Sequence, residues 1–183
     1  MTCPSNPNLT ADQLRDLLAY DEPTGLFFWQ VKPRKGVQIG DVAGYIDPRG
    51  YVLIKVAGFR IYAHRLAWLF STGEWPSQDI DHRDGDKSNN RIGNLRDVSK
   101  NLNAQNIAAA FNSSKVGLLG VSPSGKKFQA RIYTNNKQRC LGSFLTPEEA
   151  HAAYLTAKRE IHPGMVEARY GFPVENRPEV VMV

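Results

Sequence analysis

The chain has 183 residues, of which 42% are hydrophobic and 22% are charged, proportions that are ordinary for a folded soluble protein of one large domain or two small ones. Its two cysteines, Cys3 and Cys140, are too few for a disulfide framework or a cysteine-based zinc site, and they suit a reducing compartment. No apolar run approaches membrane-spanning length, no signal-peptide pattern opens the chain, and the formal net charge of +5 is a moderate basic excess.

The first part of the chain predicts a helix, a small antiparallel sheet and a second helix. Thr10 is a good N-cap for a helix over Ala11–Tyr20, in which leucines form an apolar stripe. The sheet is predicted from four runs of apolar, aromatic and β-branched residues that turn residues separate: Leu26–Val31, Val42–Ile46, Gly50–Val56 and Phe59–Ala63. The second helix is predicted over His64–Ser71.

Residues 79–106 carry the polar side chains on which a functional prediction depends. Asp79–His82 predicts a short strand that ends on a carboxylate and an imidazole, and an Asp-Gly turn and an Asn-rich loop follow it. Leu95–Val98 predicts a second strand, and Ser99 is a plausible N-cap for a helix. That helix carries two asparagines three residues apart on one face, Asn103 and Asn106.

This convergence of carboxylate, imidazole and amides suggests metal-assisted phosphodiester hydrolysis. A hard cation such as magnesium prefers oxygen ligands and is often held by one or two protein groups together with phosphate and water. Asp81 supplies a charged oxygen and Asn103 a neutral one. Because neighbouring side chains on a strand alternate, His82 faces away from Asp81 and could take a proton from water. An ion on the phosphate and a base on the water are the two requirements of the reaction.

The same residues resemble the HNH nuclease motif of the ββα-metal type, in the variant found in phage homing-type endonucleases. Asp81-His82 matches its paired first position, and Asn94 lies within the similar segment Asn89–Arg96. The resemblance implies that His82 is the general base, that Asn94 steadies the loop and orients the base, and that Asn103 is a helix-borne metal ligand. Asn103 stands where the name-giving pattern has histidine, which favours Mg²⁺, or Mn²⁺, over zinc. The family resemblance also implies a cytoplasmic protein of a phage-infected bacterial cell.

Two further features of this region allow other interpretations. The acidic loop resembles a calcium-binding EF-hand loop, but Gly85 is not at the sixth position and no Glu closes the loop, so calcium is not expected. His64 is either a second catalytic imidazole or a residue at the start of a helix that bonds nearby backbone. The second role is favoured because one general base suffices. Two roles stay open for Arg65: contact with a phosphate, or structural support of the motif.

The second part of the chain predicts a three-stranded sheet packed on one helix. No Asp or Glu occurs from residue 98 to residue 147, which favours contact with a polyanion such as DNA. Strands are predicted over Gly117–Val121, Lys126–Tyr133 and Gln138–Phe144, and a helix with a capping box begins at Thr146. In the middle strand the apolar residues alternate with a polar face. The residues expected to contact DNA are Lys115, Lys126, Lys127, Gln129, Arg131, Tyr133, Lys137 and Arg139.

This second part resembles the APETALA-type DNA-binding domain of plant ethylene-response factors and of phage homing endonucleases. The matching stretches are Gly120-Val121, Lys127–Ile132, Leu141–Phe144 and the helix that begins at Pro147. The base-reading residues do not transfer, because Ser122 and Cys140 stand where plant members carry Arg and Trp.

Together these features predict the fold class α+β: a small antiparallel sheet and helix leading into a ββα-metal motif, then a three-stranded antiparallel sheet packed on one helix. The expected domains are a nuclease domain over 1–109 with its motif at 79–106, a linker over 110–116, a DNA-binding domain over 117–172 and a tail over 173–183. The expected function is metal-dependent, site-preferring cleavage of double-stranded DNA, without a membrane or a small-molecule cofactor. A non-catalytic DNA-binding regulator with a relict nuclease fold, an RNA-directed nuclease, and the choice between monomer and homodimer stay open.

Overall fold

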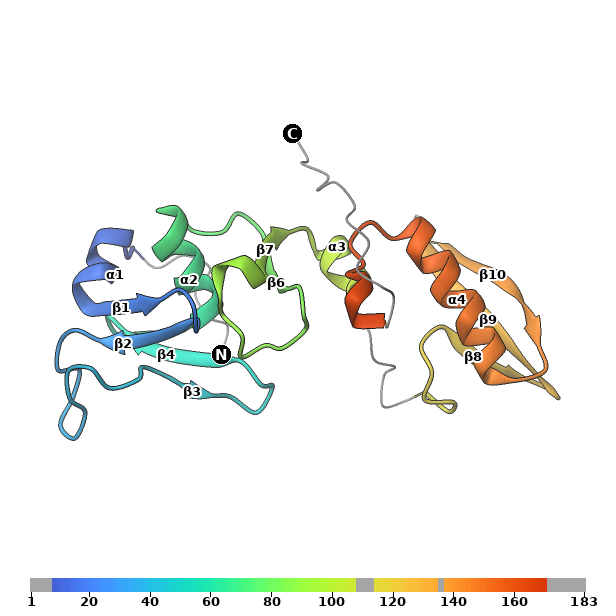
Figure 1. Cartoon of the computed structure of the whole chain (residues 1–183), viewed down its shortest axis with the longest axis horizontal. Coiled ribbons are helices and arrows are strands. Elements are labelled where there is room, and N and C mark those ends of the chain that lie inside the picture. The colour runs from blue at the N-terminus through green and yellow to red at the C-terminus, as the bar shows by residue number, and fades with distance from the viewer. Residues whose placement is uncertain (1–7, 108–113, 135–136, 171–183) are drawn as a thin grey trace. The chain divides into compact units, whose positions relative to one another are not determined.

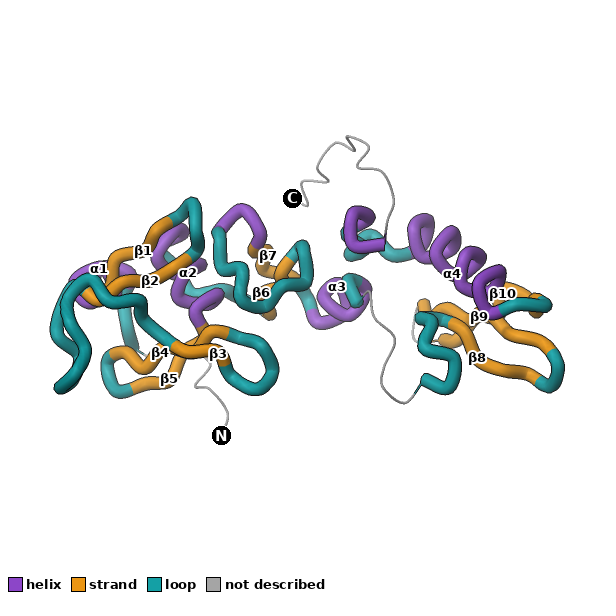
Figure 2. The backbone as a smooth tube through the Cα atoms, turned by 60° about the horizontal axis from the view of Figure 1, so that its bottom comes forward, coloured by secondary structure: helices purple, strands orange, loops and turns teal. Residues whose placement is uncertain are grey.

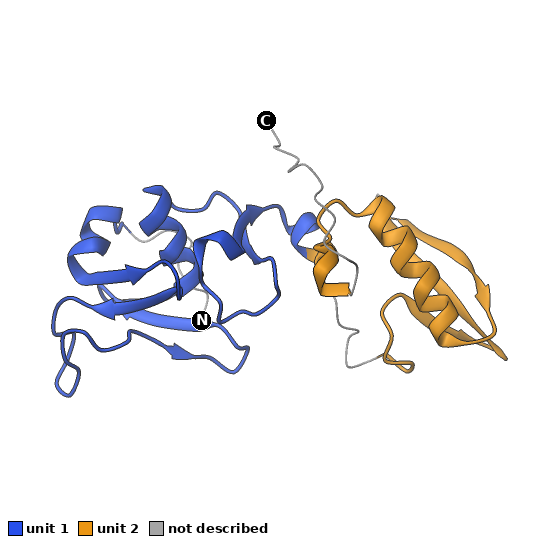
Figure 3. Cartoon of the chain, in the orientation of Figure 1, with its two compact units in different colours: residues 1–103 blue, residues 104–183 orange. Residues whose placement is uncertain are grey.

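The computed structural model describes residues 8–107, 114–134 and 137–170 (Figure 1). The chain divides into two compact units, residues 1–103 and 104–183 (Figure 3). Small antiparallel sheets, a ββα region and a C-terminal sheet packed on a helix confirm the predicted α+β class. The expected tail over 173–183 and residues 110–113 of the expected linker lie outside the described residues. Within the described ranges, no helix combines the length and the apolar character that crossing a membrane requires.

The N-terminal unit begins with two helices and two small sheets. Its elements before the polar stretch are α1 (Ala11–Leu17), β1 (Leu18–Asp21), β2 (Leu26–Trp29), β3 (Tyr45–Ile46), β4 (Val52–Val56), β5 (Phe59–Tyr62) and α2 (Ala63–Thr72). Strands β1 and β2 form one antiparallel hairpin, and β3, β4 and β5 form a second antiparallel sheet in that order (Figure 2).

The predicted first helix is too long at its C-terminal end. Thr10 caps α1, as expected, and also forms a capping box with Gln13, but the backbone becomes extended at Leu18 (φ −136°, ψ 138°). Leu18 then pairs with Trp29 across the β1–β2 hairpin, and its side chain is fully buried. Pairing with a partner strand therefore overrides the helical periodicity. The predicted strand over Val42–Ile46 is also shorter than expected, because Val42 forms only an isolated bridge to Phe28.

One hydrophobic core joins the elements of this unit. Its most deeply buried side chains are Leu14, Leu18, Phe27, Ile54, Leu66 and Leu69. These residues come from α1, from both sheets and from α2, and each buried side chain of this size contributes about 1.5–3 kcal/mol relative to an exposed one. The core thus gives α2 and the two sheets a fixed arrangement before the polar stretch begins.

The polar stretch forms the predicted strand, strand and helix. Strands β6 (Asp79–His82) and β7 (Leu95–Val98) have the predicted bounds, and the short 3-10 helix η1 (Ile92–Asn94) precedes β7. Helix α3 (Lys100–Gln105) follows, with the Ser99 hydroxyl accepting from Leu102 N at 3.4 Å. The prediction that Asn106 shares this helix with Asn103 is wrong. Asn106 lies beyond its end, and its Oδ1 accepts from Val166 N at 3.3 Å within the C-terminal unit.

The C-terminal unit contains the predicted sheet and helix. Its elements are β8 (Val121–Ser124), β9 (Lys127–Thr134), β10 (Lys137–Phe144), α4 (Pro147–Ile161) and the 3-10 helix η2 (Glu167–Tyr170), with strand order β10-β9-β8 (Figure 1). The Thr146 capping box is confirmed. The first strand begins at Val121, where the predicted strand over Gly117–Val121 ends, and it continues to Ser124.

Glycine at position 120 permits the packing of this sheet on α4. Gly120 has φ +77°, and a Cβ atom at this position would overlap the ring of Tyr154. Its carbonyl accepts from Arg131 N at 2.8 Å. Ala130, Ile132 and Ala150 are buried with Tyr154 in the small core of this unit. A side chain at Gly120 would therefore displace the sheet from its helix.

Candidate functional site

The β6–β7 hairpin brings a carboxylate and an imidazole to adjacent positions. In the antiparallel register Asp81 is opposite Arg96 and His82 is opposite Leu95. Ile80, Asp81 and His82 are all buried, so both faces of this short hairpin are covered. The contacts of the two polar residues differ, since Asp81 binds across the hairpin and His82 contacts the loop and neighbouring rings. This difference agrees with the expected alternation of neighbouring side chains.

Asp81 is held by a buried ion pair that the sequence analysis did not predict. Arg96 donates to Asp81 Oδ2 from Nη2 at 2.6 Å and from Nε at 2.8 Å. The side chain of Asp81 is 8% exposed and that of Arg96 is 19% exposed. Two charge-assisted bonds to one oxygen fix the orientation of the carboxylate. The signal in the sequence is Arg96 in the segment Asn89–Arg96, which faces Asp81 once the hairpin register is known.

His82 is buried, with 4% of its surface exposed, and it contacts Asn90 of the Asn-rich loop. His82 Nε2 lies 3.4 Å from Asn90 Oδ1, and Asn90 Nδ2 donates to Ser88 O at 2.9 Å. Because an amide oxygen only accepts, Nε2 carries the hydrogen in this contact and Nδ1 holds the basic lone pair. Burial lowers the pKa of His82. The Asn90 contact and nearby aspartates act in the opposite direction and offset part of this lowering. The imidazole is therefore neutral at physiological pH.

Asn94 braces the loop that carries these groups. Its Oδ1 accepts from Asp84 N at 3.1 Å, and its Nδ2 donates to Asp84 Oδ1 and to Asn89 O, each at 2.9 Å. Its own carbonyl accepts from Arg83 N at 2.8 Å. The amide contact to the His82 ring comes from Asn90, a residue to which the sequence analysis gave no role. Asn90 is 1% exposed, and this burial becomes visible only in the folded chain.

The N-terminal hairpin supports the same loop from behind. Tyr20 donates its hydroxyl to Asn90 O at 2.8 Å, and Arg91 Nε donates to Pro23 O at 2.5 Å. Gly25 has φ +73°, and a Cβ atom there would lie 2.5 Å from Arg91 N. The turn between β1 and β2 thus contacts the backbone of the Asn-rich loop directly, and only glycine allows this approach.

A second histidine lies against the first. The rings of His64 and His82 are 5.2 Å apart, edge to face, and the His64 ring stacks on Tyr62 at 5.3 Å. Tyr51 contacts both histidines, at 5.4 Å from His64 and 6.0 Å from His82. The expected bond from His64 to nearby backbone is absent at Nδ1, which is buried and has no hydrogen-bond partner among the described residues. Burial, and then the neighbouring His82, lower the pKa of His64 to about 3.

The oxygen donors of this region suit a hard divalent ion. In the described ranges, no group of three or more His, Cys, Asp or Glu side chains could hold a metal ion. Magnesium is often held by one or two protein groups, with phosphate and water completing its shell. Asp81 lies on β6, and Asn103 is half-buried on α3 with its backbone N–H bonded to Ser99 O at 2.9 Å. A carboxylate and an amide oxygen are compatible with such an ion.

The residues expected to contact DNA divide between two faces of the C-terminal sheet. Paired residues of antiparallel strands share a face. Lys127, Gln129, Arg131 and Tyr133 alternate along β9 with the residues that pack on α4, so they lie on the opposite face. There Arg131 donates to Gln129 Oε1 from Nε at 3.1 Å and from Nη2 at 2.5 Å.

The remaining predicted residues are exposed at other places. Arg139 is opposite the buried Ile132, and Lys137 is opposite Thr134, so the register does not bring them onto the Arg131 face. Lys126 lies in the turn before β9, and Lys115 lies in the segment before β8.

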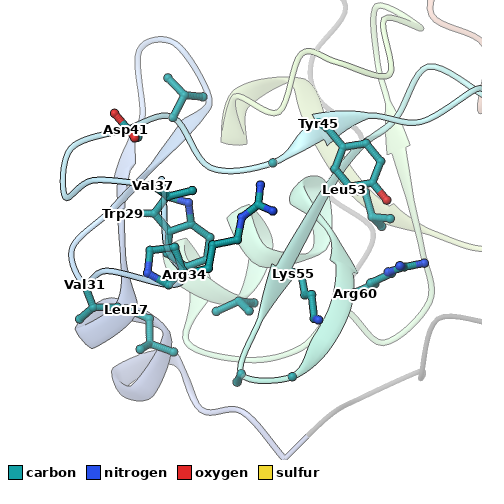
Figure 4. Close-up of a pocket in the computed structure, with 16 residues that line it drawn as sticks. Leu17, Trp29, Val31, Arg34, Val37, Asp41, Tyr45, Leu53, Lys55 and Arg60 are labelled. Atoms are coloured by element: carbon teal, nitrogen blue, oxygen red, sulfur yellow. The ribbon is translucent and has the colours of Figure 1, made fainter.

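A separate cavity of about 740 Å³ lies beside β2, β4 and β5 (Figure 4). Aromatic and cationic side chains line part of it: Trp29, Arg34, Tyr45, Lys55 and Arg60. None of the predicted catalytic or metal-binding residues lines this cavity. The candidate chemistry is therefore located at the β6–β7 hairpin and not in this cavity.

Comparison with known families agrees with this location. A family model described as HNH endonuclease matches residues 61–105, which begin at the end of β5 and include α2, β6, β7 and α3. No curated protein and no solved structure matches the chain. Residues 61–105 are an HNH endonuclease domain, which implies hydrolysis of phosphodiester bonds, a DNA substrate and the use of a divalent metal ion.

Proposed function

We propose that the HNH endonuclease domain at residues 61–105 makes this chain a magnesium-dependent DNA endonuclease with His82 as its general base. The observation that carries the proposal is the β6–β7 hairpin, which holds a fixed carboxylate and a neutral imidazole on adjacent residues. The family match by itself does not assign a role to any residue. The burial and hydrogen bonds of Asp81 and His82 supply the physical reason for the assignment.

In the proposed mechanism, His82 accepts the proton of the attacking water. Its basic lone pair is on Nδ1, because the Asn90 contact keeps the hydrogen on Nε2. Asn90 therefore fixes both the tautomer and the orientation of the ring. Asn94 contributes indirectly by holding the loop to Asp84.

Asp81 and Asn103 are the proposed ligands of the metal. Their oxygen donors favour Mg²⁺, with Mn²⁺ as an alternative, and do not favour zinc. When bound, the ion would stabilise charge on the phosphate and on the leaving oxygen. Arg96 orients Asp81 through Oδ2 and balances its charge in a buried position.

The burial of His82 favours a second candidate function. With 4% of His82 exposed and Asp81 paired with Arg96, water reaches the base only after a local rearrangement or through contact with the substrate. A non-catalytic DNA-binding regulator with a relict nuclease fold needs no such access. The two candidates differ in one measurable property, which is cleavage of DNA.

The C-terminal unit is the proposed DNA-binding module. Its support is the acid-free stretch from residue 98 to residue 147 and the polar face of β9. The proposed domains are 1–109 for the nuclease, 110–116 for a linker, 117–172 for the DNA-binding domain of APETALA type and 173–183 for a tail. Arg131, Gln129 and Tyr133 would contact bases, while Lys115, Lys126, Lys127, Lys137 and Arg139 would contact phosphates. This division would give a homing-type, site-preferring enzyme of a phage-infected cell.

Nicking of supercoiled plasmid tests the enzymatic proposal. Wild-type protein should relax the plasmid when magnesium is present and should fail when the metal is chelated. His82→Ala should lower the rate by about a hundredfold or more, the usual contribution of a general base. His151→Ala is the matched control, because it removes a histidine of the other unit whose ring contacts Leu119 O and Tyr154 and none of the proposed DNA-binding residues. Equal nicking by wild type and His82→Ala would reject the assigned base, and absence of nicking on any DNA would favour the regulator.

Salt dependence tests the DNA-binding module separately. With the metal chelated, the logarithm of the association constant of the full chain for duplex DNA should fall linearly with the logarithm of the salt concentration. The reason is that several phosphates are neutralised together. Arg131→Gln should change the sequence preference of binding. Lys126→Gln should instead weaken binding to all duplexes equally and lower the salt slope of binding by about one. An affinity that does not depend on salt, or that survives removal of residues 114–183, would contradict this role.

A further inference from the structure

Two exposed cations meet over an aromatic ring next to His82. Lys87, in the loop between β6 and β7, places Nζ 4.8 Å from the centre of the Tyr51 ring. Arg49, in the turn between β3 and β4, places Cζ 6.0 Å from the same ring and 5.5 Å from the Tyr62 ring. Lys87 Nζ also donates to Arg49 O at 3.1 Å, so the two loops are tied together.

The rings under these cations lead directly to the candidate base. Tyr51 lies 6.0 Å from His82, and Tyr62 stacks on His64, which in turn contacts His82. Each step is one ring contact. One ring, that of Tyr51, thus links Lys87 to the buried imidazole of His82.

The charges of the two cations are used differently. Arg49 pairs with Asp47 at 3.1 Å and also donates to the Tyr62 hydroxyl. Lys87 is exposed and forms no ion pair within the described residues, although Asp84 and Asp86 belong to its own loop. The carboxylates of both aspartates accept hydrogen bonds from within the loop. Asp84 accepts from Asp86 N and Asn89 Nδ2, and Asp86 accepts from Ser88. Lys87 therefore has no counterion among the described residues.

We propose that Lys87, supported by Arg49 and the Tyr51 ring, binds a backbone phosphate of the DNA strand that is cut, and so presents the neighbouring phosphate to His82. Lysine has three N–H donors, and the bond to Arg49 O uses one of them. Phosphate is the chemical class that an unpaired lysine and an arginine on adjacent loops recognise best. We call Lys87, Arg49 and the Tyr51 ring the clamp. This inference rests on the proposed function and extends it, because it assigns a contact with the cleaved DNA strand to the nuclease unit itself.

Plasmid nicking at varied DNA concentration and salt tests the clamp in the full chain. Lys87→Gln should raise the KM for plasmid about fivefold and lower the salt slope of duplex binding by about one, as expected for one lost phosphate contact. The kcat should change less than the KM, since Lys87 does not touch the reacting atoms. Tyr51→Leu should show a similar rise in KM because the aromatic ring under Lys87 is removed, whereas Tyr51→Phe keeps the ring and should raise the KM less than Tyr51→Leu does.

Lys55→Gln is the matched control. It removes one exposed cation from β4 of the same unit, at the cavity wall away from Tyr51. If Lys55→Gln and Lys87→Gln raised the KM equally, the effect would be one of total charge and the clamp would be rejected. Unchanged KM and salt slope in Lys87→Gln, with wild-type nicking intact, would also reject it. Absence of nicking by wild type would instead reject the proposed function, and the salt slope of binding in chelator would still report on the clamp.

Discussion

His64 packs edge to face against His82, with ring centres 5.2 Å apart, and its Nδ1 has no hydrogen-bond partner in the described part of the chain. Two imidazoles in contact cannot both be charged at low cost, and burial keeps His64 neutral. His64 is therefore a neutral ring packed against the candidate base. Its position also has a direct consequence for the stability of the protein.

The free energy of unfolding should fall on acidification because of His64. Its pKa is about 3 in the folded chain and 6.5 when unperturbed. Between these values the unfolded chain binds a proton that the folded chain does not, so stability is lost as pH falls through this range. The loss due to His64 is up to about 5 kcal/mol. His64→Phe lacks this group and keeps a ring on Tyr62. Urea unfolding at pH 7 and pH 4.5 should show a smaller loss for His64→Phe than for wild type, and equal losses would contradict the burial argument.

Breaking the ion pair between Asp81 and Arg96 should destabilise the nuclease unit. Arg96→Met leaves a buried carboxylate without its counterion, which costs about 3–5 kcal/mol for a fully buried pair. The double variant Asp81→Asn, Arg96→Met removes both charges and should recover part of this loss. A double-mutant cycle of urea midpoints measures the coupling. Additive effects of the two single substitutions would show that the pair does not interact in solution.

The contact between the first hairpin and the Asn-rich loop should be needed for both stability and nicking. Gly25→Ala places a methyl group against the backbone of residues 90 and 91, and it forces Asn90 away from His82. Gly36→Ala is the control, since Gly36 has a similar φ of +87° but open space around it. Gly36→Ala should cost only about 1 kcal/mol of backbone strain. Nicking by Gly25→Ala should fall well below that of Gly36→Ala, and equal rates would argue against the supporting role of the hairpin.

The C-terminal unit should become more stable at alkaline pH because of Lys158. This lysine is 2% exposed, and its Nζ donates to Ile107 O at 2.9 Å and lies 4.6 Å from the centre of the Tyr170 ring. Burial, and then Arg169, lower its pKa from 10.5 to about 8. From pH 8 to 10.5 the folded chain loses this proton before the unfolded chain does, so stability should rise by up to about 3 kcal/mol.

Lys158→Met separates this effect from other titrations. The variant has no ammonium group, so its unfolding free energy should lack the alkaline rise attributed to Lys158. Chemical unfolding of both proteins from pH 7.5 to pH 10 provides the comparison. Parallel curves for the two proteins would show that Lys158 titrates normally in the folded state.

The sequence by itself determined the local elements of both units and the identity of the polar residues. Strands β6 and β7 have the predicted bounds, Thr10 and Thr146 both act as the predicted N-caps, and the alternation along β9 gives the predicted buried and polar faces. These features depend on side chains a few residues apart, so periodicity and turn chemistry suffice to predict them. The family resemblance located the nuclease domain for the same reason, because its motif is a local pattern.

Only the tertiary structure decided which of these residues meet. Leu18 is extended and not helical because it pairs with Trp29, and Asn106 lies beyond the end of α3, where its side chain accepts from Val166 N. The pair Asp81–Arg96 and the contacts of His82 with Asn90 and His64 join residues whose separation in sequence carries no periodic signal. Such contacts are selected by burial, where an unpaired charge or amide is costly, and burial is a property of the whole fold.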